Sequence, residues 1–183
     1  MRGEVDRFMK LLLVLLSTFM LGSPAMAIGV GVGLAGVDET DDRPKLAANL
    51  HLIWNENIFT DALYYGWDFG PVSQRNFIVA TGTEYKISGS EYFCFRVGLT
   101  LIDQQTTLYK DKTSRSLPNP PKPEVESDVS AGVLMGAVLH MFPKGPLIAD
   151  LTWDAHLYVP GVAAIFLTFG RVEVVSLVVG TRL

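Results

Sequence analysis

From residue 28 onward, the chain alternates large apolar residues with polar or small ones at a period of two, and this pattern constrains the fold most strongly. In residues 93–101, the odd-numbered positions are Phe, Val or Leu, whereas the even-numbered positions are Cys94, Arg96, Gly98 and Thr100. Successive side chains of a β-strand point to opposite faces, so the pattern predicts strands with one apolar and one polar face. The segments that follow it are 28–36, 45–54, 60–69, 75–86, 91–102, 128–141, 147–159 and 171–183.

The first 27 residues have the features of a cleaved secretory signal peptide instead. Basic residues at positions 2, 7 and 10 precede an apolar run over 11–21, and the small-residue sequence Ala25-Met26-Ala27 follows it. This run is far shorter than the roughly 20 residues that a transmembrane helix needs. A basic start, a short apolar core and a small-x-small end are typical of export signals. We therefore expect cleavage after Ala27 and a single exported domain over 28–183.

Composition narrows the class of fold further. Hydrophobic residues make up 49% of the sequence, yet after residue 27 every apolar run is short and interrupted by glycine or charge. Apolar residues spread over short segments favour strands over membrane-spanning helices. Cys94 is the single cysteine, so no intramolecular disulfide is expected, and a net charge of −4 gives no electrostatic basis for nucleic-acid binding.

The predicted connections alternate in length. The longer ones are 37–44, 70–74, 103–127 and a stretch after Tyr158, and the shorter ones are 55–58, 87–90 and 142–146. Long loops at one end and short turns at the other are typical of outer-membrane barrels. Residues 103–127 contain four prolines and many charges, so we expect a mobile loop there. The apolar stretch 161–169 fits an extension of the last strand, an extra strand or a helical lid.

Two features indicate that the polar face points into the barrel. That face is rich in glycine and alanine, which suits the narrow lumen of eight strands. Aromatic residues of the apolar face concentrate near strand ends, as in the two girdles of a membrane barrel. The predicted girdle residues are Trp54, Trp67, Phe69, Phe77, Tyr85 and Phe93. The alternative is a soluble periplasmic barrel whose apolar face forms the interior and binds an apolar ligand.

The signal peptide, the eight alternating segments and the unequal loops resemble the small outer-membrane barrels of the OmpA, OmpX and OmpW type. The resemblance covers residues 28–183 and is architectural, without a family-specific motif. It implies an all-β fold, an eight-stranded antiparallel up-and-down transmembrane β-barrel in the bacterial outer membrane. It also implies contact with outer-membrane lipid and with the outer-membrane assembly machinery, and a monomer without a cofactor.

Charged residues on the predicted lumen face indicate an ion-pair network. Charges inside a low-dielectric wall must be paired or hydrated. Glu84 and Arg96 lie on adjacent strands joined by the 87–90 turn, close enough for a diagonal contact. The residues predicted to form this network are Glu84, Arg96, His140 and Asp150.

An enzymatic alternative places a catalytic triad near the long-loop end. If residues opposite each other across the 142–146 turn sum to about 287, Ser130 comes close to His156, and Asp154 lies two residues from His156 on the same face. Serine, histidine and carboxylate form an acyl-transfer triad, which predicts a lipid-modifying hydrolase or acyltransferase. The spacing of His140, Asp150 and His156 follows no known metal-ligand pattern, so no metal is predicted. The sequence favours a non-enzymatic barrel that acts through extracellular loops or as a narrow pore.

Overall fold

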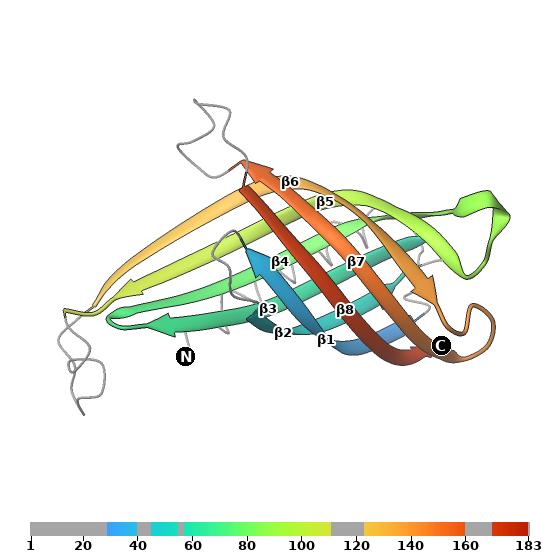
Figure 1. The fold of residues 1–183 in the computed structure, drawn as a ribbon, viewed down its shortest axis with the longest axis horizontal. Coiled ribbons are helices and arrows are strands. Elements are labelled where there is room, and N and C mark those ends of the chain that lie inside the picture. The colour runs from blue at the N-terminus through green and yellow to red at the C-terminus, as the bar shows by residue number, and fades with distance from the viewer. Residues whose placement is uncertain (1–28, 40–44, 55–56, 111–122, 160–169, 183) are drawn as a thin grey trace.

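The computed structural model describes residues 29–39, 45–54, 57–110, 123–159 and 170–182, which form a closed antiparallel barrel of eight strands (Figure 1). Each strand pairs with the next along the chain, and β8 closes the barrel on β1 from Gly29↔Arg182 to Glu39↔Val172. The predicted fold class is confirmed. Within the described residues, no helix has the length and apolar character needed to cross a membrane. The elements are β1 (Gly29–Glu39), β2 (Lys45–Ile53), β3 (Ile58–Phe69), β4 (Val72–Lys86), the 3₁₀ turn η1 (Ile87–Gly89), β5 (Phe93–Leu108), β6 (Glu124–His140), β7 (Leu147–Val159) and β8 (Gly170–Arg182).

The apolar faces of the strands point outward and the polar faces point into the barrel. On β1, Val32 is 65% exposed, whereas Ala35 and Val37 on the opposite face are buried. On β5, Leu99 is 67% exposed, whereas the neighbouring inward position Thr100 is buried. This orientation is the one predicted from the small residues of the polar face.

Strand β3 departs from the prediction, because its apolar face points inward. Leu63 and Tyr65 are buried inside the barrel, on the same face as Asp61, whereas Tyr64 is exposed on the outside. Trp67 follows on this inward face, with the Lys45 ammonium 5.2 Å from its ring centroid. The reason is that the long-loop half of the lumen is filled with apolar side chains. Where both faces of a strand contact apolar surroundings, a period of two does not reveal which face is inside.

The strands near the long-loop end are longer than predicted. Strand β5 continues to Leu108 and β6 begins at Glu124, so much of 103–127 is paired strand rather than loop. Only Gly70 and Pro71 separate β3 from β4, so the predicted 70–74 loop is a tight turn, with Gly70 at a positive φ of 56°. Strands β3 to β6 project together beyond the other strands (Figure 1). The predicted signal peptide and the 161–169 stretch lie outside the described residues.

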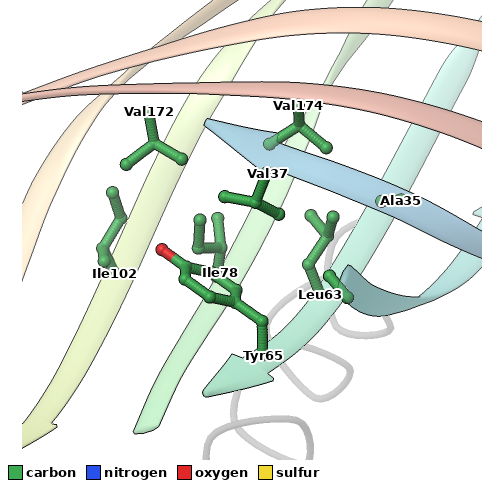
Figure 2. Close-up of a cluster of buried hydrophobic side chains, with 9 residues drawn as sticks. Ala35, Val37, Leu63, Tyr65, Ile78, Ile102, Val172 and Val174 are labelled. Carbon is green, nitrogen blue, oxygen red and sulfur yellow. The ribbon is translucent and has the colours of Figure 1, made fainter. Parts of the chain in front are cut away.

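The long-loop half of the lumen is filled by a cluster of buried apolar side chains, here called the apolar plug. Its members come from six strands and gather in the space between them (Figure 2). Each is at most 2% exposed, so the plug excludes water from this half of the interior. The plug consists of Ala35, Val37, Ala47, Leu63, Tyr65, Ile78, Ile102, Val172 and Val174.

Candidate functional site: a charged cluster in the lumen

Arg96 occupies the centre of the other half of the lumen. Its side chain on β5 is fully buried and forms ion pairs with Asp61 on β3, Glu84 on β4 and Asp154 on β7. The distance is 3.4 Å from Nε to the Glu84 Oε1 atom and 2.5 Å from Nη1 to the Asp154 Oδ2 atom. The guanidinium also stacks on Phe59, 3.6 Å from the ring centroid. One cation therefore ties three separate strands together across the barrel.

Two histidines extend this arrangement. His51 Nδ1 lies 2.7 Å from Asp61 Oδ1, directly across the β2–β3 pair. His140 contacts Glu84 through Nε2 at 3.2 Å and Asp150 through Nδ1 at 2.9 Å. We call these side chains together the lumen cluster: His51, Asp61, Glu84, Arg96, His140, Asp150 and Asp154. The cluster holds four carboxylates and one guanidinium, so the two histidines are its remaining groups that can carry positive charge.

The structure brings together the four residues that the sequence predicted as a network. Glu84 lies directly opposite Arg96 in the β4–β5 register rather than diagonally, and His140 lies opposite Asp150 in the β6–β7 register. Asp61 was not among the predicted residues, because the alternation pattern assigned the two faces of β3 the wrong way round. The missed signal is its charge, since a carboxylate in the middle of a barrel strand has to face the lumen if lipid lies outside.

A glycine makes room for one of these carboxylates. Gly136 on β6 lies directly opposite Asp154 on β7, and a Cβ atom at Gly136 would collide with the Asp154 Oδ1 atom and the Trp153 carbonyl. The absence of a side chain at this position therefore lets the Asp154 carboxylate lie against the barrel wall and reach Arg96.

The predicted catalytic triad is not assembled. Opposite residues of β6 and β7 sum to 290 rather than 287, because His140 pairs with Asp150, so His156 faces Leu134 instead of Ser130. Ser130 lies four residues farther along β6, toward the long-loop end. His156 contacts Thr100 Oγ1 through Nδ1 at 3.1 Å. Among the described residues, Ser130 Oγ and His156 Nε2 have no hydrogen-bond partner, and the carboxylate of Asp154 is engaged by Arg96.

The lumen cluster is reached through a cavity of about 370 Å³ at the short-turn end of the barrel. Glu84 and His140 line it together with Cys94, Lys86 and Arg182. Near its mouth Lys144 pairs with Glu91 at 2.7 Å, and the hydrogen bond from this ammonium lowers the pKa of the Glu91 carboxyl. The described residues hold no group of three or more His, Cys, Asp or Glu side chains placed to bind a metal ion.

The predicted aromatic girdles are found only in part. Tyr85 and Phe93 are exposed at the short-turn end, and Phe69 is exposed at the tip of the β3–β4 hairpin. Trp54 and Phe77 keep the outward register but are buried, and Trp54 donates a hydrogen bond from Nε1 to Thr60 Oγ1 at 2.8 Å. The prediction is wrong for Trp67, which faces inward.

An eight-stranded closed antiparallel barrel with a charged lumen and an apolar outer surface is the fold of the small outer-membrane β-barrels. No family model and no curated protein matches the sequence. Two solved structures show the likeness of fold. The N-terminal β-barrel domain of Pseudomonas aeruginosa OprF superposes with a TM-score of 0.54 at 12% identity, covering 86% of this chain and 98% of that one.

The second structure is Ail, the attachment invasion locus protein of Yersinia pestis, in complex with the heparin analogue sucrose octasulfate. It superposes with a TM-score of 0.50 at 16% identity, covering 86% of this chain and 97% of that one. At this level of identity the likeness extends to the fold alone.

Proposed function

We propose that the protein is an integral outer-membrane β-barrel of a Gram-negative bacterium that acts as a closed, non-enzymatic scaffold. It is a monomer surrounded by outer-membrane lipid, and it is inserted by the outer-membrane assembly machinery. Its function lies in the strand extensions at the long-loop end rather than in the lumen. Recognition sites are commonly carried by segments that a rigid scaffold holds in place.

The observation that carries this proposal is the inverted distribution of side chains. Leu46, Leu99 and Val179 are more than half exposed on three different strands, whereas Arg96 and Asp61 are buried inside. A soluble protein rarely exposes a contiguous apolar patch larger than a few hundred Å². A barrel in lipid places its apolar residues outward. A soluble barrel that binds an apolar ligand is disfavoured, since the plug and the lumen cluster fill most of the interior and charged side chains line the cavity at the short-turn end.

A pore is also disfavoured by the way the lumen is filled. The apolar plug lines the long-loop half with hydrocarbon, and its one hydroxyl, that of Tyr65, donates a hydrogen bond to Glu39, so the plug offers little to replace the hydration of an ion. In the other half, Arg96 bridges three strands across the lumen. We therefore expect the purified protein to show little or no conductance in planar bilayers.

The extensions of β5 and β6 are the strongest candidates for an interaction surface. They carry exposed carboxylates at Glu124, Glu126 and Asp128, and Ser127 donates a hydrogen bond to Asp103 at 3.2 Å across the pair. Since these strands remain paired beyond the main barrel, the acidic residues are held on a sheet rather than on a loose loop.

Cell fractionation tests this proposal directly. The protein, expressed with its N-terminal segment in a Gram-negative host, is expected in the outer-membrane fraction and to change its gel migration on heating. Circular dichroism of the purified protein should show β-structure. Recovery in a detergent-free soluble fraction would overturn the proposal.

A further inference from the structure

The outward surface of β5, β6 and β7 contains a groove of about 400 Å³. Its floor is formed by the methyl side chain of Ala155 and by the backbone of Gly136, and both residues are buried. Larger apolar side chains rise on both sides, namely Phe95, Met135, Trp153 and Leu157. A volume of roughly 300 to 1,000 Å³ is typical of sites for small molecules. We call this groove the outer slot.

Trp153 is the feature that the girdle arrangement leaves unexplained. It lies at the middle of β7, yet the residue is 46% exposed on the outward face. Tryptophan in membrane proteins concentrates at the lipid–water boundaries because its ring is amphipathic. In the outer slot Trp153 instead forms a wall beside Ala155, two residues farther along β7 on the same face.

Among the described residues that line the slot, one is a cation. Arg171 on β8 lies directly opposite Leu157 in the β7–β8 register, at the long-loop end of the slot. Its side chain is 56% exposed and pairs with Glu173, the next outward residue of β8. The outward residues that follow along β8, Val175, Leu177 and Val179, are apolar and exposed. Arg171 therefore lies where the apolar belt ends, at the level expected for lipid head groups.

We propose that the outer slot binds one lipid, with an acyl chain along Ala155 and Gly136 and a phosphate head group on Arg171. This inference rests on the proposed insertion of the barrel into a membrane. The slot is apolar over most of its length and cationic at one end, which matches an acyl chain joined to an anionic head group. A guanidinium presents several N–H donors and binds phosphate through paired hydrogen bonds, so it can keep Glu173 while it holds the head group.

The test compares lipid binding by native mass spectrometry after refolding in detergent. The probes are dimyristoylphosphatidylglycerol and dimyristoylphosphatidylcholine, which have the same chains but different head-group charge. Ala155→Phe fills the slot, and Ala155→Leu fills it partly. Ala149→Phe is the matched control, because Ala149 lies on the outward face of the same strand and does not line the slot. Arg171→Gln removes the charge and keeps hydrogen-bonding capacity.

We expect the unmodified protein to bind one phosphatidylglycerol about tenfold more tightly than phosphatidylcholine, as a charge-assisted contact predicts. Ala155→Phe should weaken both lipids about tenfold or more, Ala155→Leu should weaken them less, and Ala149→Phe should leave both unchanged. Arg171→Gln should remove the preference for phosphatidylglycerol.

Equal lipid binding by the unmodified protein and Ala155→Phe would overturn the proposal that the outer slot binds lipid. A preference for phosphatidylglycerol that survives Arg171→Gln would overturn it as well. Heat-dependent gel migration of every variant is measured first. If the unmodified protein fails to insert, the proposed function fails. If it inserts normally but the slot variants bind lipid as the unmodified protein does, only this inference fails.

Discussion

The two halves of the lumen are built from the same eight strands but are filled in opposite ways. The half near the short turns holds the lumen cluster around Arg96, whereas the half near the long loops holds the apolar plug around Ile78 and Ile102. In the short-turn half, the charged groups are stabilised by partners across the barrel. In the long-loop half, the apolar side chains are stabilised by close packing. The comparison shows that a barrel interior can be polar on one side of its midpoint and resemble a soluble core on the other.

The largest effect is expected from removing the central cation. Arg96→Met leaves Asp61, Glu84 and Asp154 without their shared partner, and breaking a buried ion pair costs about 3 to 5 kcal/mol of unfolding free energy. Urea unfolding in lipid vesicles, followed by tryptophan fluorescence, measures this loss. Arg171→Met on the outward face is the control, and equal losses for the two variants would contradict the central role of Arg96.

A smaller loss of unfolding free energy is expected from creating a cavity in the apolar plug. Ile102→Ala leaves a cavity among close-packed neighbours and should cost roughly 2 to 4 kcal/mol in the same unfolding assay. Leu99→Ala on the outward face of the same strand is the matched control, because lipid chains can fill the space that Leu99 leaves. If both variants lose the same stability, the long-loop half is not packed as described.

A moderate loss of unfolding free energy is expected from substituting Gly136, the glycine that makes room for Asp154. Gly136→Ala places a methyl group against the Asp154 carboxylate, so we expect a loss of about 1 to 3 kcal/mol. At Gly36 on β1, a Cβ atom would meet no heavy atom within 4 Å, so Gly36→Ala should leave the unfolding free energy nearly unchanged. A tolerated Gly136→Ala would show that Asp154 has room to move away from Arg96.

The smallest effect is expected from Ser130. Its hydroxyl has no hydrogen-bond partner among the described residues, so Ser130→Ala should change the unfolding free energy by less than about 0.5 kcal/mol. Thr100→Val should cost more, since it removes the hydroxyl that contacts His156. Loss of a lipase activity in Ser130→Ala would restore the triad hypothesis.

The sequence predicted what depends on alternation, and it failed where alternation is ambiguous. The outward direction of Leu99 and the inward direction of Arg96 could be predicted, because lipid and a charged lumen differ sharply in polarity. Leu63 and Tyr65 do not, because the plug is as apolar as the outside, and this inverted face concealed Asp61. The pairing of Ser130 with His156 failed for another reason. An error of three in the β6–β7 register sum is small along the sequence, but the observed register places His156 opposite Leu134, four residues from Ser130.

The pairing of β1 with β8 has a consequence for how the barrel forms. Gly29 and Arg182 lie at opposite ends of the described chain, yet they lie directly opposite each other where β1 pairs with β8 in the closed sheet. Contacts between distant residues form slowly, because the entropy of closing a long loop is lost before the contact is made. The edge of β1 therefore remains open until the last strand arrives. During that interval the unfinished sheet exposes backbone groups that pair readily with other chains.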